Sequence, residues 1–483
     1  MATDGHLNLT LLTDFYELTM TNGYLENGLQ DREAVFDMFF RTVPDGGGYA
    51  IMAGVEQLVA YLQRLTFTEE DLAYLRQRGL FSEAFLAYLK DFRFQCDVWA
   101  VPEGTPIFPG EPIVTVRGPV LQAQFIETMV LLSINHQSLI ATKANRIARA
   151  AAGRPVLEFG SRRAQGADGA LLGARAAYIG GCAGTACTLA ERRFGIPAMG
   201  TMAHSWVQMF PDELEAFRAY ARTYPAHCTL LVDTYNVLKS GVPNAIRAFQ
   251  EEVVPRGFRP GGIRIDSGDI TYLSREARKL LDAAGFEDCP IVASNALDEW
   301  IIRDLLVQGA AVDLFGVGER LITSRSEPVF GGVYKLAASE GAGGALEPRI
   351  KLSENVGKIT NPGFKALWRL FDRETGMALA DVVTLAEEVI DDTAPYELFD
   401  PVYTWKRKTL RHFRAQRLLE PLFRKGQCCY EPESATALRA RCAQQVGTLW
   451  EAVLRFENPH SYIVDLSPKL WALKQALLTE HGL

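Results

Sequence analysis

Four short, mostly apolar segments decide the fold: TLLVD at residues 229–233, GIRID at 262–266, PIVAS at 290–294 and VDLFG at 312–316. They do not alternate between apolar and polar residues, which is typical of strands buried on both faces of a parallel sheet. Longer amphipathic segments, such as residues 273–284, separate them, and the apolar residues of these segments recur at helical spacing. This alternation of strands and helices predicts an α/β fold.

Two earlier segments, residues 156–159 and 198–202, have the same apolar character and extend the predicted sheet. In barrels and doubly wound sheets, binding and catalytic side chains follow the carboxyl ends of the strands. We therefore expect functional residues directly after each segment. The residues at or just after those ends are Arg162, His204, Asp233, Asp266, Asn295 and Gly318.

The sequence on either side of this core follows other patterns. Residues 94–120 predict β structure interrupted by Pro and Gly, and residues 121–152 predict one long helix. Residues 337–345 are Gly-rich and predict a surface loop. The basic residues between 406 and 417 predict a helix with a solvated face.

Composition and charge exclude several classes of protein. The chain has 483 residues, 48% hydrophobic and 22% charged, which indicates a folded protein with several cores. Its net charge of -8 argues against broad attraction to nucleic acid or to an anionic membrane. Residues 171–190 are apolar, but Arg175 and many small residues favour a buried segment over a membrane span. Asp4 stands where a signal peptide carries positive charge, so we expect a cytoplasmic protein.

The segment IRIDSGDI at 263–270 is the most informative about chemistry. In a strand, Arg264 and Asp266 project to the same side, so they form either a buried ion pair or part of a site. Ser267 and Gly268 favour a site, because a hydroxyl and a glycine amide can donate hydrogen bonds to an oxygen anion. The carboxylates could then hold ribose hydroxyls or a metal ion.

A second signal is LFGVGER at 314–320, where Gly316 and Gly318 lead into a predicted helix. Free backbone N–H groups at such a turn can bind phosphate. A tight turn between strand and helix explains the same two glycines without a ligand.

His204 follows a predicted strand end and has hydroxyl neighbours in Thr201 and Ser205. Such a His is either structural or an acid, a base or a nucleophile, and we expect the two hydroxyls to contact substrate.

In LEFGSRRAQG at 157–166, Phe159 precedes Arg162 and Arg163. Adjacent guanidinium groups suit phosphates and an aromatic ring suits a planar partner, although surface arginines after a core Phe give the same pattern.

Seven motifs along the chain resemble those of the nicotinate phosphoribosyltransferase family. They are TDFYELTM (13–20), EFGSRRAQG (158–166), GTMAHSW (200–206), IDSGD (265–269), FGVGERL (315–321), IKLSENVGKITNPG (350–363) and PHSYIVDLS (459–467). Their order and number make the resemblance specific, and it spans nearly the whole chain.

The resemblance implies a type II phosphoribosyltransferase, which is an irregular α/β barrel with an N-terminal α/β domain and a C-terminal extension. We accordingly expect the N-terminal domain over 1–120, the barrel over 121–365, and a C-terminal region over 366–483 that packs partly on the others. The family joins nicotinate to phosphoribosyl pyrophosphate and releases nicotinate mononucleotide and pyrophosphate in NAD biosynthesis. The resemblance also implies ATP hydrolysis through a phosphohistidine, Mg²⁺ with the phosphates, and a homodimer with shared active sites.

The same resemblance implies roles at the ring and at the histidine. Phe159 would stack on one face of the pyridine ring and the partner subunit's Tyr16 on the other. Arg264 would lie near the nicotinate carboxylate, and His204 would be the phosphorylated residue. Asp266 would hold ribose hydroxyls or metal-bound phosphate, so His204, Asp266 and Arg264 are the expected catalytic residues.

For the phosphates, the resemblance implies that Arg162 and Arg163 bind phosphate groups and that Gly316 and Gly318 cradle the ribose 5-phosphate. One residue departs from the family pattern. Glu319 follows the second glycine, and its carboxylate would repel a phosphate unless Arg320 offsets it or its side chain points away.

Three alternatives stay open at this stage. Nicotinamide is neutral, and its carboxamide calls for an acceptor beside the ring rather than an uncompensated cation. Quinolinate carries two ring carboxylates, which need a larger basic cluster. A non-catalytic barrel could instead bind phosphorylated metabolites, or partners through the basic C-terminal stretch.

Overall fold

The computed structural model describes residues 8–354 and 358–482, so Asp4 and part of the 350–363 motif lie outside the described residues. The fold is mixed α/β, as the sequence predicts. It divides into two compact units: unit 1 combines Met1–Leu139 with Val329–Leu483, and unit 2 is Ile140–Pro328. These units group segments by spatial contact, whereas the three expected domains follow chain order and stay a prediction.

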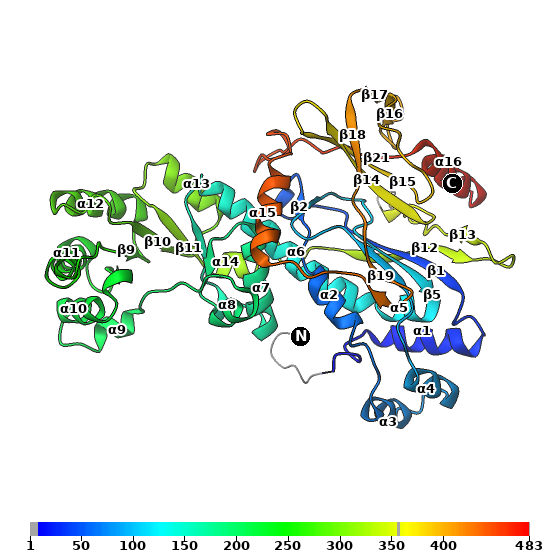
Figure 1. Ribbon diagram of the computed structural model, residues 1–483, viewed down its shortest axis with the longest axis horizontal. Helices are drawn as coiled ribbons and strands as arrows, with labels where there is room; N and C mark the ends of the chain where they lie inside the picture. Colours follow the sequence, from blue (N-terminus) through cyan, green and yellow to red (C-terminus); the bar gives the residue numbers. More distant parts are fainter. Residues whose placement is uncertain (1–7, 355–357, 483) are drawn as a thin grey trace. The chain divides into compact units, whose positions relative to one another are not determined.

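Unit 2 is built on a six-stranded sheet in which every pairing is parallel (Figure 1). Its strands are, in spatial order, β7 (Gly184–Thr185), β6 (Val156–Glu158), β11 (Leu314–Val317), β10 (Ile291–Asn295), β9 (Gly262–Ile265) and β8 (Thr229–Leu231). Ile263, Ile291 and Phe315 on the central strands have no exposed surface, as expected for strands covered on both faces. Five of the six predicted strands are therefore confirmed.

Helices of unit 2 follow the strands and cover the sheet. They are α7 (Gly166–Gly180), α8 (Thr188–Phe194), α9 (His204–Gln208), α10 (Glu213–Thr223), α11 (Val242–Ala248), α12 (Ile270–Ala283), α13 (Glu299–Val307) and α14 (Glu319–Ile322). α7 contacts β6 and β7, while α12 contacts β9 and β10. The apolar segment at 171–190 supplies most of the buried α7, and no helix within the described ranges is long and apolar enough to cross a membrane.

The predicted strand at 198–202 is wrong. Ala198 forms only an isolated bridge with Thr185, and the short strand β7 occupies the position beside β6. Gly184 permits this, because a Cβ there would lie 2.7 Å from the carbonyl oxygen of Pro197. Residues 200–203 are consequently an irregular loop that leads into α9.

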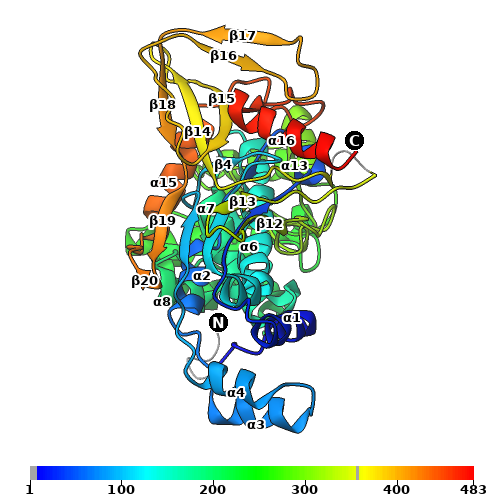
Figure 2. The ribbon, with the colours of Figure 1, turned by 90° about the vertical axis from the view of Figure 1, so that its right-hand side faces the viewer.

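Unit 1 contains a seven-stranded sheet and a four-stranded sheet. The larger runs β13 (Leu346–Pro348), β12 (Val333–Glu340), β1 (Glu33–Phe39), β5 (Val114–Pro119), β3 (Asp97–Ala100), β19 (Glu420–Arg424) and β20 (Gln427–Cys428). The smaller runs β18 (Phe413–Arg417), β14 (Lys365–Asp372), β15 (Ala378–Leu385) and β21 (Val464–Leu466). Two strand pairs complete the unit: β2 (Ala50–Ile51) with β4 (Pro106–Ile107), and β16 (Tyr396–Phe399) with β17 (Arg407–Leu410), drawn in Figure 2.

Helices of unit 1 surround these sheets. They are α1 (Phe15–Glu26), α2 (Val55–Leu62), α3 (Glu69–Gln77), α4 (Glu83–Lys90), α5 (Val120–Phe125), α15 (Ala435–Val446) and α16 (Pro468–Glu480). A further helix, α6 (Glu127–Ala150), contains the boundary between the two units. The predicted single helix at 121–152 is therefore wrong in one detail, since α5 and α6 are separated at Ile126.

The basic stretch between 406 and 417 is not a helix, which corrects the prediction. It forms β17 and β18, and β18 pairs with β14. Leu410 and Phe413 are buried in the core of the small sheet, whereas Arg407 and Arg411 are exposed. Two buried side chains among exposed cations are typical of an edge strand. In the sequence alone, the same run of charges resembles the solvated face of a helix.

Candidate active site

A pocket of about 570 Å³ in unit 2 gathers most of the residues predicted to act. It lies after the carboxyl ends of β6, β9, β10 and β11, where parallel sheets place their ligands. The predicted residues that line it are Phe159, Arg162, Arg163, Thr201, His204, Arg264, Asp266, Gly316 and Gly318. Four predicted residues are not in its lining: Tyr16, Ser205, Ser267 and Gly268.

Arg264 presents a positive charge to the pocket and is held there by neutral acceptors. Its Nη1 donates to Thr201 Oγ1 at 2.8 Å and its Nη2 to the carbonyl of Met202 at 3.0 Å. Within the described part of the chain it forms no ion pair, and its buried Nε has no partner. Burial lowers the pKa of Arg264, the effect being opposed by Asp266 and Asp233, but a guanidinium stays protonated in proteins. The arrangement suits an anionic group on a ligand.

Asp266 and Asp233 are held by hydroxyl groups rather than by cations. Ser294 donates a short hydrogen bond to Asp266 Oδ1. Ser267 donates to Asp233 Oδ2 at 2.6 Å, so its hydroxyl is engaged away from the pocket lining. Asp233 also accepts from the backbone N–H of Asp266 at 3.2 Å, and its buried Oδ1 has no partner among the described residues.

His204 is the first residue of α9 and lines the pocket. Its Nδ1 lies 3.1 Å from Thr234 Oγ1, which fixes the orientation of the ring. Nε2 makes no hydrogen bond within the described chain, so it is the nitrogen open to chemistry. Ser205, beside it, is exposed and does not line the pocket.

The Phe159 ring is packed against the glycine turn. A Cβ on Gly316 would lie 2.6 Å from Phe159 Cδ2, a distance that real Cβ atoms do not adopt. Glycine is therefore required at 316 for the ring to reach this position, whatever its role toward phosphate. The backbone N–H of Phe159 donates to the Val317 carbonyl at 2.7 Å, which ties β6 to β11.

Glu158 is a buried residue of this site that the sequence analysis did not single out. It has no exposed surface, and its carboxylate accepts hydrogen bonds from the Gly160 N–H and from Thr185 Oγ1, the latter at 2.6 Å. Burial raises the pKa of Glu158, and these two hydrogen bonds oppose the rise. Since Glu158 flanks Phe159 in the chain, it fixes the turn that carries the aromatic ring. The sequence signal that could have identified Glu158 is its place next to Phe159 at a strand end.

Ser294 and Asn295 also line the pocket and were not predicted to act, although Asn295 was noted as a strand end. Asn295 has a φ of 140°, a left-handed backbone that is uncommon outside glycine, and its Oδ1 accepts from the Ala296 N–H at 2.6 Å. Strain at a strand end is common in binding sites, and only the backbone coordinates reveal it.

The charges around the glycine turn are paired locally. Glu319 lines the pocket but accepts from Arg325 Nη1 at 3.2 Å, and Arg320 forms a short ion pair with Asp298. Arg325, rather than Arg320, therefore offsets the negative charge of Glu319, the residue that departs from the family pattern. Arg162 and Arg163 are exposed at the pocket edge, where they can reach phosphate oxygens.

Two family models match the chain: the nicotinate phosphoribosyltransferase (NAPRTase) N-terminal domain over residues 11–135 and the C-terminal domain over residues 364–474. A nicotinate phosphoribosyltransferase of Bacillus subtilis (strain 168) is 41% identical over 473 residues, covering 98% of this chain and 96% of that protein. The chain belongs to the nicotinate phosphoribosyltransferase family. A nicotinate phosphoribosyltransferase of Homo sapiens is 33% identical to this chain, covering 97% of this chain and 96% of the human protein.

Solved structures agree with this family assignment. The crystal structure of human nicotinic acid phosphoribosyltransferase superposes with a TM-score of 0.85 at 32% identity, covering 96% of this chain and 99% of that chain. A nicotinate-nucleotide pyrophosphorylase from Pyrococcus furiosus, at a TM-score of 0.70 and 23% identity, shares the fold. The family resemblance of the motifs is therefore confirmed.

Proposed function

We propose that the chain catalyses the reaction named by its family: nicotinate and phosphoribosyl pyrophosphate give nicotinate mononucleotide and pyrophosphate. The observation that carries the proposal is Arg264, whose guanidinium lines the pocket with no carboxylate paired to it. A ring carboxylate would form an ion pair with this guanidinium, whereas the neutral carboxamide of nicotinamide would not. Phe159, which lines the same pocket, provides an aromatic face for the pyridine ring.

The chemistry needs stabilisation of opposite charges more than proton transfer. The pyridine nitrogen attacks the anomeric carbon with its own lone pair, so no general base is required. As the bond from that carbon to the pyrophosphate oxygen breaks, positive charge develops on the ribose and negative charge on the leaving group. We assign the ribose hydroxyls to Asp266, the departing pyrophosphate to Arg162 and Arg163, and the 5-phosphate to the turn at Gly316 and Gly318.

The residues present fit Mg²⁺ held mainly through substrate phosphates. No cluster of three or more His, Cys, Asp or Glu residues suited to a metal occurs in the described ranges. Mg²⁺ commonly uses only one or two carboxylates together with phosphates and water. Asp233 is the carboxylate we assign to it, because its buried Oδ1 lacks a partner in the described chain. When bound, Mg²⁺ would neutralise charge on the pyrophosphate.

We further propose that ATP phosphorylates His204. Nε2 would attack the γ-phosphorus of ATP, ADP would leave, and water would later hydrolyse the phosphohistidine. The contact from Nδ1 to Thr234 at 3.1 Å supports this assignment, because it leaves Nε2 as the nucleophile. Other phosphorylated side chains gain about -1.5 to -2 of charge, and a similar gain here would act on the arginines that line the pocket.

The homodimer with shared sites is also part of the proposal. Tyr16 lies on α1 in unit 1 and is 43% exposed, so its ring is available to a ligand of the partner subunit. Mixed dimers of Tyr16→Ala and His204→Ala chains would then regain activity, because each would hold one intact shared site.

The test is product formation from phosphoribosyl pyrophosphate and Mg²⁺ with nicotinate or nicotinamide, with and without ATP. We expect pyrophosphate release that depends on nicotinate and is stimulated by ATP, and loss of the stimulation in His204→Ala. Turnover with nicotinamide alone would refute the role of Arg264. Unchanged ATP stimulation in a folded His204→Ala variant would refute the phosphohistidine while leaving the transferase reaction in place.

A further inference from the structure

The pocket of unit 2 contains one carboxylate that the proposed reaction does not use. The arginines and carboxylates in its described lining are Arg162, Arg163, Arg264, Asp266 and Glu319. Of these, only Glu319 has no ligand group assigned to it. Glu319 directly follows Gly318, the second glycine of the turn assigned to the 5-phosphate. A carboxylate in this position repels a phosphate unless another charge offsets it.

The backbone around Glu319 holds the residue next to the glycine turn. Glu319 is the first residue of α14, and its carbonyl accepts hydrogen bonds from the Thr323 N–H at 3.1 Å and from Thr323 Oγ1 at 2.8 Å. The Gly318 carbonyl accepts from the N–H groups of Leu321 at 3.2 Å and Ile322 at 3.1 Å. The side chain of Glu319 therefore extends from a fixed point beside the turn.

Arg325 supplies the counter-charge to Glu319, and it does so from outside the lining of the pocket. Its Nη1 lies 3.2 Å from Glu319 Oε1, and Arg325 is not among the described lining residues. A turn at Ser324, with a left-handed φ of 42°, and a hydrogen bond from the Arg325 N–H to the Arg320 carbonyl at 3.3 Å bring Arg325 back toward α14. Arg320 itself pairs with Asp298. Only Arg325 therefore neutralises Glu319 within the described chain.

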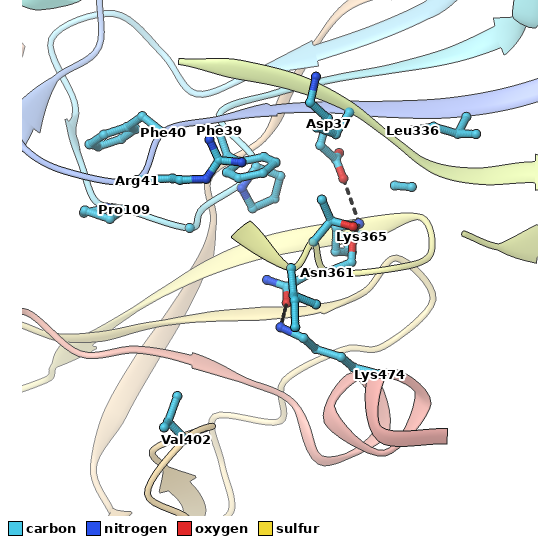
Figure 3. Close-up of a pocket in the computed structure, with 16 residues that line it drawn as sticks. Asp37, Phe39, Phe40, Arg41, Pro109, Leu336, Asn361, Lys365, Val402 and Lys474 are labelled. Carbon is cyan, nitrogen blue, oxygen red and sulfur yellow. Dashed lines mark hydrogen bonds and ion pairs between the residues drawn. The ribbon is translucent and has the colours of Figure 1, made fainter. Parts of the chain in front are cut away.

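The cavity of unit 1 shows the opposite arrangement of a carboxylate (Figure 3). There Asp37 Oδ2 lies 2.7 Å from Lys365 Nζ, and both residues line that cavity. Both side chains are nearly buried, with 5% of Asp37 and 3% of Lys365 exposed. In the pair of unit 2, by contrast, 41% of the Glu319 side chain and 60% of the Arg325 side chain are exposed. Water weakens such an exposed pair, so each of its charges also acts on a ligand in the pocket.

The 5-phosphate that would meet Glu319 is common to the substrate and the product of the proposed reaction. Phosphoribosyl pyrophosphate and nicotinate mononucleotide both carry it, so its binding energy does not favour the transition state over either of them. A turn that binds this group very tightly would also retain the product, and product release limits the rate of many enzymes. A carboxylate beside the turn weakens both complexes and therefore favours release.

We propose that Glu319 lowers the affinity of the pocket for the 5-phosphate, that Arg325 limits this effect, and that the pair thereby sets how readily nicotinate mononucleotide leaves. The inference rests on the proposed function, because it takes the 5-phosphate to lie at the turn of Gly316 and Gly318. Arg325 has a second effect. Arg162 and Arg163 lie in a turn that contacts α14, and pairing with Arg325 keeps Glu319 from competing with phosphates for them.

The test is calorimetric titration of the full chain with ribose 5-phosphate, without Mg²⁺ or nicotinate. We expect Glu319→Gln to tighten binding and Arg325→Met to weaken it, each by roughly three- to tenfold for one unit charge near a phosphate in partly screened surroundings. The double variant should bind within about twofold of the unaltered chain, because the two changes of charge cancel. Loss of structural support alone would shift both single variants in the same direction, so opposite signs identify the electrostatic role.

The kinetic signature is a split between KM and kcat. Glu319→Gln should lower the KM for phosphoribosyl pyrophosphate and the inhibition constant of nicotinate mononucleotide together, without raising kcat. The matched controls are Glu83→Gln and Arg76→Met, which remove the same charges from an exposed ion pair in unit 1. These controls should leave the affinity for ribose 5-phosphate unaltered.

Shifts of the same sign in the two single variants would overturn the proposal, as would shifts no larger than those of the controls. Absence of ribose 5-phosphate binding to the unaltered chain would also overturn it. The proposed function is tested separately, by pyrophosphate release from the unaltered chain with nicotinate. Turnover with nicotinate together with an unaltered affinity in Glu319→Gln would thus refute the role of Glu319 alone.

Discussion

Replacement of Glu158 tests whether a buried carboxylate positions the aromatic residue of the candidate site. Glu158→Ala removes the acceptor for the Gly160 N–H and for the Thr185 hydroxyl, in a place with no exposed surface. Glu158→Gln keeps a carbonyl oxygen for Gly160 and presents an amide to the Thr185 oxygen. The two variants therefore separate loss of the hydrogen bonds from loss of the charge.

The loss of unfolding free energy in Glu158→Ala follows from the two donors left without a partner. Each buried unsatisfied group costs about 1–3 kcal/mol, and the Thr185 hydroxyl can rotate, so we expect about 3 kcal/mol for Glu158→Ala. At about 2–4 °C per kcal/mol for a unit of this size, the melting temperature should fall by about 6–12 °C. Glu158→Gln should lower the free energy of unfolding less than Glu158→Ala does.

The pH dependence gives a second signature. Burial raises the pKa of the Glu158 carboxyl above its unfolded value, so the folded state holds the proton more tightly. The stability that this group contributes is full below the unfolded pKa and is lost as the pH rises through the folded pKa. Glu158→Gln does not titrate, so its melting temperature should decline less than that of the unaltered chain as the pH rises.

The assay combines differential scanning calorimetry across pH with steady-state kinetics. If Glu158 positions Phe159, the KM for nicotinate should rise in Glu158→Ala more than the KM for phosphoribosyl pyrophosphate. Glu287→Ala, at an exposed position in the same unit, is the control. A Glu158→Ala chain with unaltered melting temperature and unaltered KM for nicotinate would refute the reasoning.

Four further changes test other parts of the structure. Arg264→Met should raise the KM for nicotinate by about 10- to 150-fold through loss of charged hydrogen bonds, and an unaltered KM would contradict the ligand assignment. Gly316→Ala should raise the same KM by about tenfold or more by displacing the Phe159 ring, with circular dichroism verifying the fold. Asp381→Asn should destabilise unit 1 by about 3 kcal/mol in denaturant titrations, because it removes the carboxylate that forms the ion pair with the buried Arg369 and leaves only Glu111 to oppose that charge; Glu83→Gln, in an exposed pair, is the control. Burial raises the pKa of Glu17 to about 7, so its contribution to stability is full below about pH 4.5 and is lost as the pH rises through 7. Glu17→Gln should therefore narrow the difference in melting temperature between pH 5 and pH 8, and an unchanged difference would contradict this assignment.

Local sequence was sufficient for the parallel sheet of unit 2 and for much of its pocket. The apolar segments ending near Asp266, Asn295 and Gly318 are strands whose carboxyl ends meet, so residues far apart in sequence line one pocket. A buried strand needs a continuous apolar segment, which is a local property that the sequence displays.

Local sequence failed where pairing between distant segments decides the structure. Residues 198–202 are as apolar as a strand, yet Gly184 and Thr185 take the place beside β6. Residues 407–417 carry charges that suit a solvated helix, yet burial of Leu410 and Phe413 against a distant sheet makes them strands. Ser267 follows a strand as a phosphate-binding residue would, yet Asp233 engages its hydroxyl.

The sequence by itself therefore determined the α/β class, the family and most of the residues that line the candidate site. These depend on apolar periodicity and on motifs of a few adjacent residues. Tertiary structure alone decided that Arg264 is held by neutral acceptors and forms no ion pair within the described chain, and that Glu158 supports the turn at Phe159. Each of these depends on which groups from distant segments satisfy a charge or a hydrogen bond, and such pairings arise only when the chain has folded.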